Sequence, residues 1–273
     1  MNKNIHRLSI QLLLLLLIIP STLYAKTNTE FPGRAIYPYI KVIGLQELKK
    51  QFNHVDIVDV RSAYEFQTLK IKGAISIPLA SRHFKKQMRE LRAQSNRPII
   101  VYCNGKTCMK SYKAATKSND AKIKDVFAYD AGIMDWAKKY PQMSVLLGDP
   151  LKSSKQLISK QSFKKHNISP ETFGTLVSDR KGIVLDIRDR FQREGMSIFA
   201  GAEKRVTLDN KRRLDKYIAQ AKKQRKPLIV FDAAGKQVRW LQYYLEKKKL
   251  KKYYFMDGGI RAYIKTLSSL DNR

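Results

Sequence analysis

Short apolar runs alternate along this chain with stretches in which apolar residues recur every three or four positions. The runs Val55–Val60 and Pro98–Tyr102 are almost continuously apolar and rich in β-branched residues, which predicts strands buried on both faces of a parallel sheet. Residues Phe84–Ala93 and Met109–Lys117 carry helical spacing with lysine and other polar residues between the apolar positions. This β–α–β–α order predicts an α/β fold, in which helices flank a parallel sheet.

The same pattern occurs twice. Four landmarks recur in the same order, at an offset of 127 to 129 residues. Chance can produce one such pair, but four in register indicate an internal repeat. The landmarks of the first copy and their counterparts in the second are Ile57–Arg61 and Val184–Arg188, Gly73-Ala74 and Gly201-Ala202, Pro98–Tyr102 and Pro227–Phe231, and Ala131–Ile133 with Trp136 and Gly258–Ile260 with Tyr263.

The repeat predicts two tandem α/β domains. We place the first at residues 36–148 and the second at residues 156–270, with a polar connection that contains the turn signal Gly148-Asp149-Pro150. Residues 26–37 show no periodic pattern and are expected to form an irregular lead-in. A chain of 273 residues is long enough for two domains of this size.

The first 25 residues differ in kind from the rest. Lys3 and Arg7 lie in a short basic segment, residues 10–19 are almost entirely apolar, and Ala25 is a small residue that suits signal peptidase. This pattern is typical of a secretory signal peptide at residues 1–25. A retained anchor is less favoured, because the apolar run is shorter than the roughly 20 residues that span a bilayer. We therefore expect an exported protein without a stable membrane anchor, periplasmic in a bacterium with two membranes.

The chain is strongly basic, with a formal net charge of +31 that would fall to about +29 after loss of the signal peptide. Such a surface attracts small oxyanions, anionic lipids and nucleic acid. Lysine tracts such as Lys247–Lys249 are nevertheless typical of solvated helix faces. The sequence contains no zinc-ligand spacing and no RNA-binding signature, so we predict no metal, no cofactor and no nucleic-acid partner. It gives no indication of the oligomeric state.

Two cysteines, Cys103 and Cys108, lie five residues apart on the loop that follows the predicted strand Pro98–Tyr102. A disulfide between such close residues would staple almost nothing, which favours chemistry over architecture. Successive backbone N–H groups of a tight turn form an anion-binding nest, and the N-terminus of the next helix adds positive potential. Both effects favour the thiolate form of a cysteine. Lys106 and Lys110 would add further positive field.

These motifs together resemble the rhodanese family, over nearly all of the chain after residue 25 and in two copies. The resemblance implies that Cys103 attacks a sulfane sulfur, becomes a persulfide and passes the sulfur to a thiol or cyanide. Thiosulfate-like anions would be the donors. The motifs are Asp59–Arg61 with Glu65-Phe66, Gly73–Ile75 leading to Ile77–Leu79, the loop after Tyr102, and Gly132-Ile133 with Trp136. The loop residues that would bind substrate are Asn104, Gly105, Lys106, Thr107, Cys108 and Met109.

The loop departs from related enzymes at three positions. Phosphatases and arsenate reductases of related fold place an oxyanion-binding arginine where this chain has Met109, so phosphate-ester hydrolysis is disfavoured. A basic residue often follows the cysteine in rhodaneses, but here it is Asn104. Cys108 replaces a common threonine or arginine. It is either a small buried residue at the helix start or a resolving thiol that attacks a Cys103 persulfide, releases sulfide and leaves a Cys103–Cys108 disulfide.

The second copy lacks the nucleophile, because Asp232 stands where Cys103 stands. A carboxylate forms no persulfide and would repel an anion from the nest. We therefore predict a catalytically inactive second domain, which completes the cleft, holds the first domain rigid or binds a partner. In the well-known two-domain rhodaneses the active cysteine lies in the second domain, so their cleft geometry does not transfer to this chain.

Three functions compete at this point. A sulfurtransferase requires Cys103 but tolerates Cys108→Ser, a thiol redox protein requires both cysteines, and a non-catalytic module that binds an anionic partner depends on ionic strength instead. Asp59 and Arg61 are predicted to form a structural ion pair, with Glu65 in the same network. Trp136 and Tyr102 are predicted to be core residues.

Overall fold

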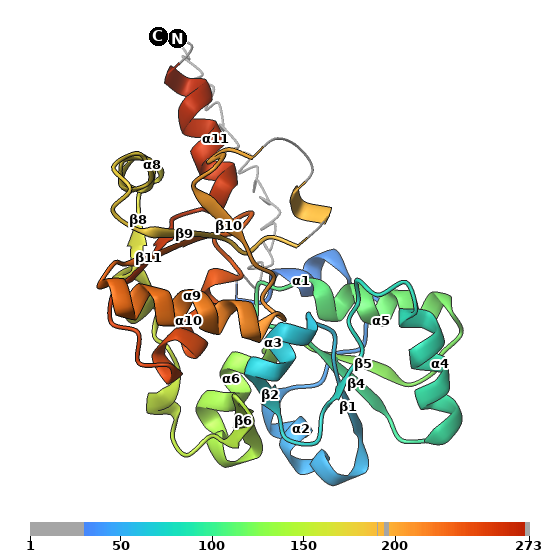
Figure 1. Ribbon diagram of the computed structural model, residues 1–273. Helices are drawn as coiled ribbons and strands as arrows, with labels where there is room; N and C mark the ends of the chain where they lie inside the picture. The colour runs from blue at the N-terminus through green and yellow to red at the C-terminus, as the bar shows by residue number, and fades with distance from the viewer. Residues whose placement is uncertain (1–29, 190, 194–196, 271–273) are drawn as a thin grey trace, which may run out of the picture.

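The structure is a computed structural model that describes residues 30–189, 191–193 and 197–270 (Figure 1). The predicted signal peptide, residues 1–25, lies outside the described residues. Within them, no helix combines the length and the apolar character needed to cross a bilayer.

The first half of the chain builds a four-stranded parallel sheet in the order β3-β1-β4-β5. Its strands are β1 (Asp56–Asp59), β3 (Ile75–Ser76), β4 (Ile99–Tyr102) and β5 (Val126–Tyr129). The helices around it are α1 (Pro32–Ile36), α2 (Leu45–Lys50), α3 (Ala63–Thr68), α4 (Phe84–Gln94), α5 (Lys110–Asp120) and α6 (Gly132–Lys139), with the 3-10 turns η1 (Phe52–His54) and η2 (Pro141–Met143). The α/β architecture predicted from the periodicity is therefore confirmed.

Both faces of this sheet are buried, as the continuous apolar runs predict. Along β4, Ile99 and Val101 pack in a cluster with side chains of α4 and α5. Ile100 and Tyr102 point to the opposite face and pack with side chains of α2 and α6. The alternation follows from the two-residue period of a strand.

The second half repeats this topology in a five-stranded parallel sheet, in the order β10-β9-β11-β12-β8. The isolated bridge between Val42 and Ala128 lies beside β5 as β8 lies beside β12. The strands are β8 (Asn167–Ile168), β9 (Ile183–Asp186), β10 (Glu203–Arg205), β11 (Leu228–Phe231) and β12 (Tyr253–Met256). The helical segments are α7 (Lys160–Lys164), α8 (Pro170–Ser178), α9 (Lys211–Gln224), α10 (Val238–Lys247) and α11 (Gly259–Leu270), with the 3-10 turns η3 (Ser154–Gln156) and η4 (Phe191–Arg193).

Two segments differ from the sequence-based expectation. The expected irregular lead-in contains α1, because Pro32 occupies its first turn, where a fixed φ and a missing N–H favour a helix. The expected polar connection contains β7 (Asp149–Pro150), which joins β2 (Leu69–Ile71) and β6 (Ser144–Leu146) in a small antiparallel sheet. The domain limits 36–148 and 156–270 stay predictions.

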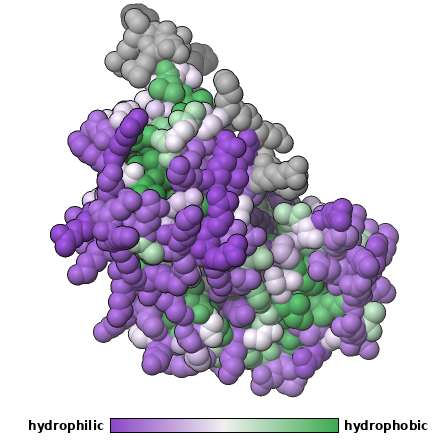
Figure 2. Space-filling model, viewed as in Figure 1, coloured by the Kyte–Doolittle hydropathy of each residue, from purple (hydrophilic) through white to green (hydrophobic). Residues whose placement is uncertain are grey.

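The two halves share one hydrophobic core. A single cluster of buried residues includes Tyr64 and Tyr102 from the first half and Trp240, Leu241 and Tyr244 from the second. Helix α10 lies against α3, as Figure 1 shows. The face of the molecule in Figure 2 is covered mostly by hydrophilic residues, consistent with the large surplus of lysine and arginine. The second half therefore packs on the side of the first sheet that carries α3.

Candidate active site

Cys103 lies at the carboxyl end of β4, where the chain leaves the sheet and turns toward α5. Its side chain is fully buried. Gly132, with φ +66°, crosses directly behind it, and a Cβ at that position would lie 2.6 Å from the Cys103 carbonyl oxygen. Only glycine fits such a close approach in this backbone conformation. The next residue, Ile133, donates its N–H to the same carbonyl at 2.9 Å. This hydrogen bond fixes the end of β4 against the start of α6.

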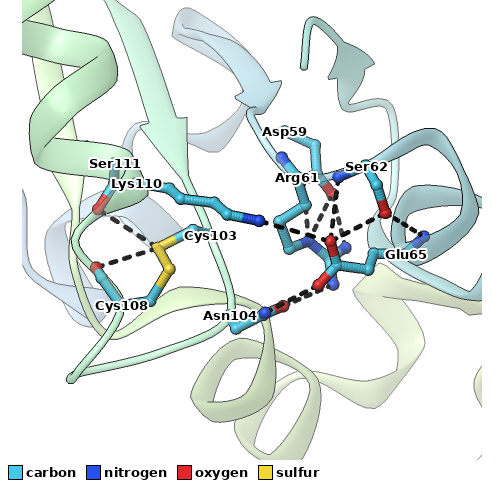
Figure 3. Close-up of a disulfide and its surroundings, with 9 residues drawn as sticks. All are labelled: Asp59, Arg61, Ser62, Glu65, Cys103, Asn104, Cys108, Lys110 and Ser111. Atoms are coloured by element: carbon cyan, nitrogen blue, oxygen red, sulfur yellow. Dashed lines mark hydrogen bonds and ion pairs between the residues drawn. A yellow bond between two sulfur atoms is a disulfide. The ribbon is translucent and has the colours of Figure 1, made fainter. Parts of the chain in front are cut away.

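The two cysteines form a disulfide, with 6.4 Å between their Cα atoms (Figure 3). Cys103 Sγ also lies 3.2 Å from the Cys108 carbonyl oxygen and 3.6 Å from Ser111 Oγ. Cys108 is only partly buried and lies two residues before Lys110, the first residue of α5. Cys108 packs against the core cluster of the first half, so its two interpretations, a packing residue at the helix start and a resolving thiol, both stay predictions. The structure represents the oxidised state, in which Cys103 becomes a nucleophile only after reduction.

Asp59 and Arg61 form the predicted ion pair at the end of β1. The guanidinium donates from Nε and Nη2 to the two Asp59 carboxylate oxygens, at 2.9 and 2.6 Å. Both side chains are fully buried. Burial by itself disfavours the charged guanidinium, but the attraction of the Asp59 carboxylate outweighs it and raises the pKa of Arg61. The pair therefore stays charged, and Arg61 also contacts the cysteine loop through Asn104.

Asn104 connects this pair to the cysteine loop. Arg61 Nη1 donates to Asn104 Oδ1 at 3.2 Å, and Asn104 Nδ2 donates to Glu65 Oε1 at 2.9 Å. Ser62 N–H donates to Glu65 Oε2 at 3.0 Å and Glu65 N–H donates to Ser62 Oγ at 3.3 Å, which together form a capping box at the start of α3; Ser62 Oγ–H also donates to Glu65 Oε2 at 2.9 Å. Glu65 thus belongs to the predicted network. Asn104, which stands where rhodaneses often have a basic residue, thus links the cysteine loop to Arg61 and Glu65.

Burial would raise the pKa of Glu65, but the charges of Lys110 and Arg61 and the hydrogen bond from Asn104 lower it overall. Lys110 Nζ lies 3.8 Å from Glu65 Oε2. Lys106 contacts Glu30 and, at 3.3 Å, Asp135. Each lysine therefore faces a carboxylate in this state, which offsets part of the positive field expected of it.

The remaining loop residues surround the disulfide. Gly105 and Met109 are half-buried and Thr107 is exposed. Gly105 accepts the Cys108 N–H through its carbonyl at 2.8 Å, which closes the turn. A cavity of about 270 Å³ lies elsewhere, beside Asp56 and Arg97 at the amino end of the strands. It is therefore remote from Cys103.

In the second copy, the backbone N–H groups of the corresponding loop bind a carboxylate. Asp232 is buried, and its Oδ1 accepts N–H groups of Ala234, at 2.8 Å, and Gly235. Its Oδ2 accepts the N–H groups of Gln237 and Val238, at 2.5 and 3.1 Å. The carboxylate itself fills the nest and leaves no N–H group of these four free for a second anion, which agrees with the expectation that Asp232 keeps an anion out. The loop after the strand is therefore built to hold negative charge.

Other features of the first site recur beside Asp232. Ile260 donates its N–H to the Asp232 carbonyl at 2.9 Å, as Ile133 does to Cys103. Arg188 pairs with Asp186 at 2.8 Å. Because the ion pair persists where the cysteine is missing, its role is structural in both copies.

One contact of the site comes from the second half and was missed by the sequence analysis. The Arg61 guanidinium carbon lies 5.0 Å from the centroid of the Trp240 ring. Trp240 is buried in an apolar helix pattern, which predicts a core residue and nothing more. No sequence signal links it to a residue almost 180 positions earlier.

Fold and site together define an α/β protein with a paired-cysteine loop at the carboxyl edge of a parallel sheet. Residues 44–139 match the family model of the Rhodanese-like domain. This part of the chain, which contains the whole loop, belongs to the rhodanese family. A rhodanese-like domain supports chemistry of the sulfurtransferase type in general.

Comparisons with individual proteins give varied names. A tRNA uridine(34) hydroxylase of Pelagibacter ubique is 26% identical over 222 residues, covering 78% of this chain and 70% of the relative. The HTH-type transcriptional regulator Rv0324 of Mycobacterium tuberculosis is 33% identical over 88 residues, covering 32% of this chain and 37% of the regulator. A crystal structure of thiosulfate sulfurtransferase from Pseudomonas aeruginosa has a TM-score of 0.37 and 17% identity, covering 84% of this chain and 43% of that chain.

Proposed function

We propose that this protein is an exported sulfurtransferase that moves sulfane sulfur from a thiosulfate-like donor to a thiol or cyanide acceptor. Reduced Cys103 attacks the outer sulfur of the donor, sulfite leaves with the electron pair of the broken S–S bond, and a Cys103 persulfide remains. The acceptor then takes the terminal sulfur and regenerates the thiolate. The protein uses no cofactor in either step.

The observation that carries this proposal is the filled nest of the second copy. There, four backbone N–H groups converge on the Asp232 carboxylate. Cys103 occupies the corresponding place in the first copy, at the start of a loop that precedes a helix N-terminus. A thiolate or persulfide anion in that place gains the same kind of stabilisation.

The predicted export is compatible with the same assignment and is a separate part of the proposal. The predicted signal peptide would carry the protein out of the cytoplasm, where disulfides persist and reductants are scarce. The Cys103–Cys108 disulfide suits such a compartment. The physiological acceptor would then be a thiol available outside the cytoplasm.

The direct test is the intact mass of the reduced protein after incubation with thiosulfate. We expect a gain of one sulfur atom in the wild type and in Cys108→Ser, and none in Cys103→Ser. Undiminished sulfur gain in Cys103→Ser would end the proposal. Loss of two hydrogens in the wild type, with a sulfur gain only in Cys108→Ser, would transfer the function to redox chemistry, because the persulfide then accumulates only where Cys108 is missing.

The disulfide favours a second candidate, a thiol redox protein. In this scheme Cys108 attacks the inner sulfur of the Cys103 persulfide, hydrosulfide leaves, and the Cys103–Cys108 disulfide forms. The two cysteine sulfurs are oxidised and the sulfane sulfur is reduced to sulfide, so an external dithiol must reduce the enzyme for each turnover. Sulfide release that requires both cysteines would establish it, whereas release without Cys108 would assign sulfide to the acceptor thiol.

The name of the Pelagibacter ubique relative raises RNA as a competing substrate class. A net charge of +31 would attract any polyanion, including RNA. Export would separate the protein from cytoplasmic RNA, so we rank this possibility, and a purely non-catalytic anion-binding role, below sulfur transfer. Salt-sensitive RNA binding together with an unchanged mass in thiosulfate would reverse this ranking.

A further inference from the structure

A tryptophan of the second half contacts the arginine that is hydrogen-bonded to the cysteine loop. The Arg61 guanidinium carbon lies 5.0 Å from the centroid of the Trp240 ring and 5.7 Å from that of the Tyr102 ring. Tyr102 belongs to the same strand as the cysteine loop, whereas Trp240 comes from α10. Trp240 is 6% exposed, so the contact is shielded from water and the cation–π attraction is not screened.

The position of Trp240 depends on Asp232. The Asp232 carboxylate accepts the N–H groups of Gln237 and Val238, which form the first turn of α10. A carboxylate at this end of a helix also interacts favourably with the helix dipole. Trp240 follows two residues later. The residue that replaced the nucleophile therefore fixes the start of the helix that delivers the tryptophan.

Arg61 in turn holds the loop through the residue next to the nucleophile. Its Nη1 donates to Asn104 Oδ1 at 3.2 Å, while its other polar contacts go to Asp59 and to the Leu69 carbonyl. The Asp59 contacts come from the same strand end and restrain the guanidinium only from one side. The Leu69 carbonyl accepts from Nη2, and the Trp240 ring, 5.0 Å from the guanidinium carbon, adds the contact that comes from the second half.

We propose that Trp240 is a positioning residue for the Cys103 loop, supplied by the second copy and acting through Arg61 and Asn104. The degenerate copy would thus have a defined role in the first site. A smaller apolar side chain at position 240 would admit water beside Arg61, and the guanidinium would share its Nη1–H between water and Asn104. The loop would then spread over more conformations, with fewer N–H groups directed at the thiolate.

The test uses the Cys108→Ser protein, in which Cys103 is the only thiol. The rate of alkylation by iodoacetamide is measured from pH 5 to pH 10 in this background and in the same protein with Trp240→Leu or Trp240→Phe. We expect Trp240→Leu to move the midpoint of the rate–pH profile upward, with a loss of about threefold to tenfold in rate at neutral pH. Trp240→Phe, which keeps an aromatic face, should lie between the two.

Two controls separate positioning from loss of stability. Leu241→Ala removes a fully buried side chain of the same helix that has no contact with Arg61 among the described interactions, and it should lower the melting temperature without moving the profile. Asn104→Ala removes the link between Arg61 and the loop, so Trp240→Leu should have little additional effect in that background.

Three results would overturn the proposal. In the first, the rate–pH profile of folded Trp240→Leu is unchanged. In the second, Leu241→Ala moves the profile as far as Trp240→Leu does at an equal loss of stability. In the third, the effects of Trp240→Leu and Asn104→Ala on the profile are fully additive. Should Trp240→Leu fail to fold, an unchanged profile in Trp240→Phe would have the same force. The inference takes from the proposed function only that Cys103 is the reacting thiol. Because alkylation requires no sulfur donor, failure of sulfur transfer would leave this test intact.

Discussion

Replacing Asp232 by asparagine should destabilise the protein far more than a surface substitution, although we predict no catalytic role for this residue. Four backbone N–H groups donate to its two carboxylate oxygens, two to each. Asparagine keeps one acceptor oxygen and turns an NH2 group toward the other two donors. The two donors that face the NH2 group would stay buried without an acceptor.

The magnitude follows from those two lost contacts. A hydrogen bond to a charged group contributes about 1.5–3 kcal/mol, and a buried donor left without a partner costs a similar amount. Relaxation of the loop recovers part of this, so we expect a loss of about 3–4 kcal/mol in the free energy of unfolding. For a chain of this size that corresponds to a fall of about 10 °C in the melting temperature.

The assay is thermal and urea unfolding of the reduced protein, followed by circular dichroism and by tryptophan fluorescence. Asp209→Asn is the matched control, since Asp209 is an exposed carboxylate in the same half. We expect the control to unfold within about 0.5 kcal/mol of the wild type. If Asp232→Asn also unfolds within that margin, the filled nest contributes nothing, and the argument from it to the Cys103 loop fails.

Three further results test other parts of the site. Because the folded state lowers the pKa of Glu65, the unfolded chain binds this proton more tightly, so the stability that Glu65 contributes is present above its unfolded pKa and lost as the pH falls through its folded pKa. Glu65→Gln should flatten the acid limb of a stability–pH curve measured between pH 7 and pH 3, and an unchanged slope would contradict this. Gly132→Ala should cost about 2–4 kcal/mol in urea unfolding, since the new Cβ would meet the Cys103 carbonyl oxygen at 2.6 Å in a backbone with φ +66°. Lys106→Ala should change the rate of thiosulfate consumption by less than about twofold, because Lys106 already faces Asp135, and a tenfold loss would show that the lysine is released for substrate.

Much of the architecture was determined by the sequence alone. The apolar runs at residues 55–60 and 98–102 predicted parallel strands, and the structure has β1 and β4 within them. The 127 to 129 residue offset predicted the repeated topology that the two parallel sheets show. The position of Cys103 at a strand end, and the ion pair of Asp59 and Arg61, also followed from local pattern. These features depend on neighbours in sequence, which is why periodicity and motif spacing reveal them.

Only the tertiary structure decided which residues support the cysteine loop and which charged groups face one another there. The Glu30 and Asp135 carboxylates that face Lys106, and the Trp240 ring over Arg61, come from segments remote in sequence. In the sequence alone, these residues have the pattern of ordinary surface or core residues. Likewise, the hydrogen bonds that stabilise the Asp232 carboxylate could not be predicted, because the number of N–H groups that converge on a carboxylate depends on loop geometry. Contacts of this kind arise from packing between distant segments, and a single sequence carries no pattern that records them.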